Sequence, residues 1–318
     1  MVDVRLATRQ EVRTSDGVRL HVVESGDPGA ELTVLLLHGW TLDHTTWTPV
    51  AEALPAACDR PVRVLRYDHR GHGASDPAPS GTATIERIAD DVVELLDALA
   101  PSGPVLLAGH SMGGMTIMAL AERHPELFVE RVAGVALVAT SSGGLSRLTF
   151  GLPRPLAGLM LAGEAAANRR LARMGRRKLT GWPPALEPFL RWLLFGPRAP
   201  RALVADAAVQ VARCHPESMV GFRASLNAHE RRAALAVLRD LPVVVLAGGA
   251  DRLCPLPHAR VIAEELPAAD LAVYPGAGHM LPVERAEEVT EWIVRLVRAG
   301  AARTPAAPEL AENREGLT

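Results

Sequence analysis

The sequence feature that most constrains the fold is the stretch from Pro104 to His124, PVLLAGHSMGGMTIMALAERH. Its residues 105–108 form a continuous apolar run, which is typical of a strand buried on both faces of a parallel sheet. Residues Met115 to Glu122 have the pattern of a helix that ends near Pro125, because proline disfavours helical geometry in the residue before it. The segment GHSMG lies between them at 109–113. The sequence therefore predicts a strand, a sharp turn and a helix.

The tip of this turn carries Ser111 in a G-x-S-x-G pattern, the nucleophile elbow. Glycines are needed on either side because side chains there would collide with the strand and the helix. The turn would expose the Ser111 hydroxyl above the sheet, at the positive end of the helix, where developing negative charge is favoured. The alternative is a glycine-rich turn with an incidental serine. The flanking strand and helix favour a nucleophile.

Strands and helices alternate along most of the chain, which predicts a doubly wound, mostly parallel α/β sheet. An antiparallel hairpin is expected first, over 10–14 and 18–24, around the turn pair Asp16-Gly17. We expect further strands at Leu32–Leu37, Val62–Tyr67, Val132–Ala139, Pro242–Ala247 and Leu271–Tyr274. We expect further helices at Trp47–Leu54, Ile85–Leu99, His258–Leu266 and Pro282–Val297.

The alternation stops at Thr140 and resumes at Leu241, and the intervening segment has helical rather than strand periodicity. We interpret residues 141–240 as a helical cap, or lid, inserted into a core made of residues 1–140 and 241–298. Residues 299–318 contain few bulky apolar side chains, so we expect a disordered C-terminal tail.

Three polar residues are expected beyond the carboxyl ends of strands, where active groups of an open α/β sheet lie. They are Ser111, Asp251 after the run VVVLAGG, and His279 in the segment GAGH. An imidazole can take the proton of a serine hydroxyl, and a carboxylate can fix the imidazole tautomer. Their order along the chain, Ser, Asp, His, fits this architecture. We predict that the three form a catalytic triad.

Other residues compete for these roles. The sequence has 11 histidines, and we expect His38 and His110 to hold turns by hydrogen bonds. His69 and His72 could suggest a metal site with Asp68, but they lie in a tight loop without a further ligand nearby, so we predict neither metal nor cofactor. The acid of the triad could instead lie directly after the next strand, Val132–Ala139. No carboxylate occurs there before Glu164.

An acyl-transfer intermediate would also need two N–H groups to bind its oxyanion. One would come from Met112, the residue after the nucleophile. The other would come from Trp40 in the segment HGW, at the end of the first buried strand. The Trp40 side chain can pack in the core at the same time, because the donor role uses only its backbone.

Composition excludes several other classes of protein. The 318 residues are 48% apolar, which suffices for a large core, and the formal net charge of −2 gives no general attraction to nucleic acid. The three cysteines, at positions 58, 214 and 254, lack metal-ligand spacing, which is typical of a reducing compartment. The N-terminus lacks a signal-peptide core. We expect a soluble, cytoplasmic protein.

The segments HGW, DHRGHGAS, GHSMGG, GGAD and GAGH, in this order, resemble those of the α/β-hydrolase superfamily, serine esterase and lipase branch. GHSMGG, DHRGHG and the segment ADRLC at 250–254 are similar to monoacylglycerol lipases. HGW followed by TLD and Trp47 is similar to bacterial esterases and cofactor-free haloperoxidases. Ser111 distinguishes the chain from haloalkane dehalogenases and epoxide hydrolases, which carry aspartate at the elbow.

The resemblance implies a hydrolase of small carboxylic esters, monoacylglycerols among them, that works through an acyl-enzyme on Ser111. His279 would be the general base and then the acid, Asp251 its orienting group, and Trp40 and Met112 the oxyanion hole. A perhydrolase, a C–C bond hydrolase or an acyltransferase would use the same triad. A small-molecule receptor on the same fold is the non-enzymatic alternative.

The predicted cap is strongly basic. Between Arg147 and Arg232, fourteen arginines and one lysine stand against five acidic residues, a net charge of +10, which leaves −12 for the rest. Apolar residues recur at helical spacing at positions 156, 159, 160, 163, 167, 171 and 174, with arginines at 169, 173 and 176 away from them. This stripe would either pack over the active site or contact an anionic membrane surface.

Overall fold

A single eight-stranded sheet runs through the computed structural model, which describes residues 7–147, 149–173 and 178–301. The strand order is β1-β2-β4-β3-β5-β6-β7-β8, and every neighbouring pair from β4 to β8 is parallel. The strands are Thr8–Arg13 (β1), Arg19–Gly26 (β2), Leu32–Leu37 (β3), Val62–Tyr67 (β4), Val105–His110 (β5), Val132–Val138 (β6), Val243–Gly248 (β7) and Asp270–Tyr274 (β8). The expected doubly wound, mostly parallel α/β sheet is confirmed.

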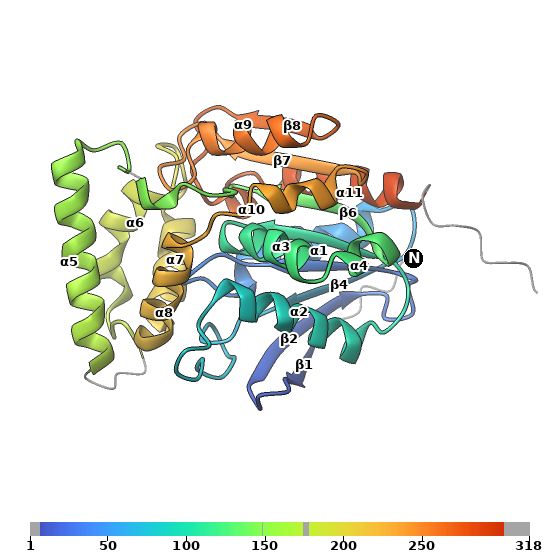
Figure 1. The fold of residues 1–318 in the computed structure, drawn as a ribbon, viewed down its shortest axis with the longest axis horizontal. Helices are drawn as coiled ribbons and strands as arrows, with labels where there is room; N and C mark the ends of the chain where they lie inside the picture. The colour runs from blue at the N-terminus through green and yellow to red at the C-terminus, as the bar shows by residue number, and fades with distance from the viewer. Residues whose placement is uncertain (1–6, 148, 174–177, 302–318) are drawn as a thin grey trace, which may run out of the picture.

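Helices cover both faces of the sheet (Figure 1). One face packs against α1 and α11, and the other packs against α2, α3 and α9. Successive strand residues supply opposite faces, so Leu35 and Leu37 belong to one core cluster and Val34 and Leu36 to the other. The helices of this core are Thr48–Ala57 (α1), Ile85–Leu99 (α2), Met112–Arg123 (α3), Pro125–Glu130 (α4), Leu256–Glu265 (α9), Leu281–Glu284 (α10) and Ala286–Ala301 (α11).

The predicted amino-terminal hairpin is present and lies at one edge of the sheet. β1 pairs antiparallel with β2, and β2 in turn pairs antiparallel with β4. The turn between β1 and β2 places Gly17 at a φ of 84°, a conformation that glycine adopts without strain. β3, β4 and α2 have the predicted bounds.

Helix α3 begins earlier than predicted, at Met112 rather than Met115. Gly113 and Gly114 are poor helix formers, so propensity alone places them in the turn. In the structure they allow close packing, because a Cβ on Gly113 would lie 2.3 Å from the Leu37 carbonyl oxygen. The helix therefore starts directly after Ser111.

The carboxyl-terminal end of the core also differs from the prediction. The expected single helix over 282–297 is divided into α10 and α11 at Arg285. Helix α11 continues to Ala301, so the tail expected from residue 299 does not begin there. The rest of that tail, residues 302–318, lies outside the described residues.

The segment between β6 and β7, which we call the cap, contains no strand in its described residues. Figure 1 shows its helices gathered at one end of the sheet, with α5 on the outer rim. They are Arg154–Arg173 (α5), Glu187–Leu194 (α6), Arg201–Arg213 (α7) and Pro216–Asn227 (α8). Among the described residues, no helix has both the length and the apolar character needed to cross a bilayer.

Candidate active site

Ser111 stands on a strained turn between β5 and α3. Its φ of 54° and ψ of −115° lie in a region that non-glycine residues rarely occupy. Its backbone N–H donates to the Val138 carbonyl of β6 over 2.9 Å, which fixes the turn to the sheet. A Cβ on Gly109 would lie 2.5 Å from the backbone of Gly113, so the turn closes only with glycine there. The side chain of Ser111 lines a cavity above the sheet.

Asp251 and His279 meet at the same end of the sheet. The Nδ1 atom of His279 lies 2.8 Å from Oδ2 of Asp251. The other carboxylate oxygen accepts hydrogen bonds from the N–H groups of Leu253 and Cys254, at 2.8 and 2.9 Å. Burial alone would raise the pKa of Asp251, but His279 and these hydrogen bonds lower it overall. Asp251 is therefore an ionised carboxylate that can hold a proton on His279 Nδ1.

His279 and Ser111 line the same cavity. Within the described residues, no hydrogen bond joins their side chains. Such bonds are commonly long in unliganded enzymes and tighten around the substrate. The structure therefore brings all three predicted triad residues to one site.

The histidines that flank the site form hydrogen bonds to the backbone, as predicted. His110 Nε2 lies 2.9 Å from the His279 carbonyl oxygen, and the His69 N–H donates to His38 Nε2 over 2.9 Å. Burial lowers the pKa of His110 to about 3, with a further contribution from the charge of His279. His110 is thus a neutral, buried support of the His279 loop.

The two predicted oxyanion donors lie close to the nucleophile. Met112 is the first residue of α3, where backbone N–H groups have no partner within the helix. Trp40 follows Gly39, whose added Cβ would lie 3.2 Å from the Ser111 Cβ. In the described part of the chain, neither the Trp40 nor the Met112 N–H donates a hydrogen bond to the protein. The fold therefore uses neither of these two N–H groups, and their role as oxyanion donors stays a prediction.

The sequence analysis missed Glu284, which connects the His279 loop to the cap. Its carboxylate accepts from the N–H of Gly278 over 3.0 Å and from the N–H of Gly196 over 2.9 Å. The His279 N–H donates to the Leu194 carbonyl over 2.7 Å. Burial raises the pKa of Glu284. Only its position five residues after His279 could have suggested this role.

The cavity has a volume of about 420 Å³ and lies between the sheet and the cap. The core supplies Trp40, Ser111 and His279, whereas most of the wall is apolar and comes from the cap. The apolar lining residues of the cap include residues of α5, α6 and the segment before α6: Met160, Leu161, Leu179, Leu186, Phe189 and Leu190. The site can therefore hold an apolar group beside a nucleophile.

Helix α5 does not turn the predicted stripe toward this cavity. Met160 lines the cavity, together with Leu161, but Leu156 and Leu159 are 54% and 71% exposed. The interpretation that the whole stripe packs over the active site is therefore wrong. A face that contains Ala157 and Leu161 packs inward instead, because only a third of a helix can face one neighbour. Met174 and Arg176 lie outside the described residues.

Asp68, His69 and His72 do not form the metal site that their spacing could suggest. The rings of His69 and His72 are buried around His38, with centroids 4.1 and 5.3 Å from it. Asp68 is hydrogen-bonded instead to His44, at 2.7 Å to its backbone nitrogen and 2.8 Å to Nδ1.

Comparison with known proteins places this geometry in a family. The alpha/beta hydrolase family matches residues 34–292. A dihydrolipoyllysine-residue acetyltransferase component of the acetoin cleaving system from Pseudomonas putida is 32% identical over 289 residues. The match covers 86% of this chain and 65% of that relative, so the chain spans somewhat less than two thirds of it. A pimeloyl-[acyl-carrier protein] methyl ester esterase from Aromatoleum aromaticum is 29% identical, over 83% of this chain and 98% of the esterase.

Solved structures have the same architecture. A thermophilic esterase from Thermogutta terrifontis is similar with a TM-score of 0.71 and 27% identity, covering 92% of this chain and 99% of the esterase. The family match extends from β3 into α11 and includes the elbow, Asp251 and His279. The chain belongs to the alpha/beta hydrolase family.

Proposed function

We propose that the protein is a serine hydrolase that cleaves carboxylic esters of small or medium acyl chains through an acyl-enzyme. The observation that carries this proposal is the 2.8 Å contact between His279 Nδ1 and Asp251 Oδ2, in a cavity that Ser111 also lines. The similarity to methyl ester and thermophilic esterases supports ester cleavage.

In this mechanism His279 Nε2 takes the proton of Ser111 as its Oγ attacks the ester carbonyl carbon. The carbonyl oxygen becomes an oxyanion, which the N–H groups of Trp40 and Met112 stabilise. His279 then gives the proton to the leaving alcohol, so the C–O bond breaks and the acyl group remains on Ser111. Water, activated by His279, releases the acid by the same steps in reverse.

The acyl group would occupy the apolar wall that the cap supplies. A panel of p-nitrophenyl esters from acetate to laurate tests this assignment, and we expect the highest kcat/KM above acetate. Leu161→Phe narrows the cavity and should shift the preference toward shorter chains. Leu159→Phe is the matched control, because Leu159 lies on the same helix but is 71% exposed.

Failure to hydrolyse any ester in this panel would contradict the proposal. Adding hydrogen peroxide or an alcohol to the assay identifies the competing activities, because a perhydrolase or an acyltransferase would give peracid or a new ester instead of free acid.

We also propose that the cap contacts anionic membrane surfaces, where lipid esters occur. Leu156 and Leu159 are exposed on α5, and Arg169 and Arg173 of the same helix are exposed. Figure 1 places α5 on the outer rim, with other cap helices between it and the sheet. An exposed apolar and basic helix of this kind binds acidic lipids through burial of apolar area and charge attraction.

A further inference from the structure

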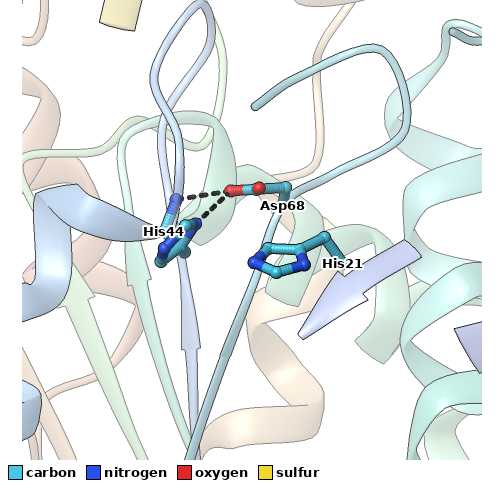
Figure 2. Close-up of side chains that lie close together, drawn as sticks. All are labelled: His21, His44 and Asp68. Carbon is cyan, nitrogen blue, oxygen red and sulfur yellow. Dashed lines mark hydrogen bonds and ion pairs between the residues drawn. The ribbon is translucent and has the colours of Figure 1, made fainter. Parts of the chain in front are cut away.

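Three potential metal ligands meet in a cluster that does not line the cavity. His21 lies in β2, His44 begins the 3₁₀ helix His44–Trp47, and Asp68 follows β4 (Figure 2). The ligand atoms of the three side chains all lie within 4.8 Å of one another. No other group of this kind occurs among the described residues.

The Asp68 carboxylate is fixed in place before any ligand binds. Its Oδ1 accepts from the His44 backbone N–H over 2.7 Å, and its Oδ2 accepts from the Ala74 N–H over 2.8 Å. An added Cβ on Gly73 would lie 2.3 Å from the carboxylate, so the following loop packs directly on it. Burial alone would raise the pKa of Asp68, but its hydrogen bonds to His44 and Ala74 lower it. The cluster therefore contains a buried negative charge.

His21 contributes an imidazole that the fold does not use. In the described part of the chain, neither nitrogen of its ring makes a hydrogen bond, and only its backbone N–H donates, to Ser75 Oγ. Its ring meets the His44 ring edge to face, with centroids 5.2 Å apart. Figure 2 shows one nitrogen of the His21 ring on the side of His44. Burial lowers the pKa of His21, so the ring is neutral at neutral pH and keeps a lone pair for a cation.

We propose that His21, His44 and Asp68 form a binding site for a divalent cation of the zinc class. Two imidazoles and one carboxylate are a ligand set that zinc prefers, with water in the fourth position. At metal–ligand distances of about 2.1 Å, tetrahedral geometry places ligand atoms about 3.4 Å apart. The 2.8 Å contact between His44 Nδ1 and Asp68 would open slightly, and His21 would move closer. Both histidines are only partly buried, so their rings can make these small movements.

Binding would change the tautomer of His44. His44 Nδ1 lies 2.8 Å from Asp68 Oδ1 and donates to it, whereas a metal bound through Nδ1 requires the neutral tautomer of His44 that carries its proton on Nε2. Two arginines near the cluster, Arg9 and Arg66, are balanced by two acidic residues, Glu11 and Asp43. The charged groups around the cluster therefore neither attract nor repel a cation on balance.

The site would join three separate segments of the core. It connects β2 and the loop after β4 to the segment that carries Trp40, four residues before His44. In the same segment, the Asp43 N–H donates to Gln210 of α7 in the cap, over 3.1 Å. A bound cation would therefore stabilise the fold and hold the segment of the predicted oxyanion donor.

Calorimetric titration of chelator-treated full-length protein with zinc chloride tests the proposal. We expect one equivalent to bind and the melting temperature to rise. His21→Ala and His44→Gln should each weaken binding by at least about tenfold, because each removes a ligand. Zinc-edge X-ray absorption should show two imidazole ligands in the parent protein. Melting curves of the metal-free variants show whether they fold.

The matched control is His124→Gln. His124 also pairs with a carboxylate, at 3.0 Å from Asp90, and its side chain is 27% exposed against 19% for His44. It belongs to no three-ligand group, so this variant should bind zinc as the parent does. His279→Ala should also keep the bound equivalent, which separates the site from the triad. The proposal is overturned if the parent binds no stoichiometric zinc, or if the His21 and His44 variants bind it as tightly as the parent.

Discussion

The walls of the cavity come from two regions that are built differently. The core side consists of loops at strand ends, and hydrogen bonds to buried backbone fix Ser111, Asp251 and His279 there. The cap side consists of apolar side chains on helices and on the segments between them, and several large apolar residues of the cap, such as Trp182 and Phe189, remain exposed. The difference suggests a division of roles, in which the core determines the reaction and the cap determines the substrate.

The largest expected effect is that of removing the nucleophile. Ser111→Ala should reduce ester turnover by on the order of 10⁶-fold and leave the fold intact, because triad members act as a unit. A fluorophosphonate probe should label the parent protein and not the variant. If the probe still labels the variant, the nucleophile is another residue. The proposal that these core residues determine the reaction would then be wrong.

Asp251→Asn should have the next largest effect. The amide keeps the shape of the carboxylate but favours the wrong tautomer of His279, at a cost of roughly 10⁴-fold in turnover. Steady-state kinetics should show the loss in kcat. A loss of less than about tenfold would mean that another carboxylate orients His279.

Glu284→Gln tests the contact where the two regions meet. The variant keeps one acceptor for the N–H groups of Gly196 and Gly278, so the His279 loop would shift relative to the cap. Small misplacement of a catalytic group costs up to about 100-fold in kcat, and we expect a loss of 10- to 100-fold with little change in KM. Glu288→Gln is the control, because that side chain is 42% exposed on α11. If kcat is unchanged, Glu284 does not position His279.

Acid should destabilise the core through its buried histidines. Burial lowers the pKa values of His69 and His110 to about 3 and that of His72 to about 4. Between these values and about 6.5, the unfolded chain binds more protons than the folded one, so stability falls as pH decreases. Each histidine should cost about 2 kcal/mol between pH 7 and pH 5.

Urea unfolding at the two pH values measures this difference. Replacing His72 by asparagine should lower the number of protons that the chain takes up on unfolding at pH 5 by about one. Equal stability at pH 7 and pH 5 would contradict the buried, neutral state of these rings.

The smallest effect should come from the outer surface of the cap. Replacing Arg169 and Arg173 by glutamine should weaken binding to phosphatidylserine vesicles by about fivefold for each arginine near the surface. Turnover of p-nitrophenyl acetate should not change. The same replacements at Arg198 and Arg213, which are also exposed in the cap, control for net charge. Vesicle sedimentation at low and high salt measures binding. If the protein does not bind vesicles even at low salt, the cap does not contact membranes and serves only as a lid.

The sequence by itself determined the core. Continuous apolar runs and amphipathic periodicity placed β3, β4 and α2 at their observed bounds, because those patterns reflect burial of one element against its neighbours. The order of the motifs also indicated which residues follow strand ends, and thus that Ser111, Asp251 and His279 would lie at one edge of the sheet. Parallel strands bring their carboxyl ends together whatever their separation along the chain.

The tertiary structure alone decided how distant segments meet. Helical spacing identifies an apolar stripe on α5 but not the direction in which it faces, and Leu156 and Leu159 face outward because the cavity contacts Met160 and Leu161. Glu284 has a local partner in Gly278 and gains its second partner only when Gly196 of the cap reaches the His279 loop. His21, His44 and Asp68 are separated by more than twenty residues at each step and meet because β2 pairs with β4. Such contacts depend on the three-dimensional path of the chain. Local sequence patterns do not predict them, because each pattern reports only on its own element.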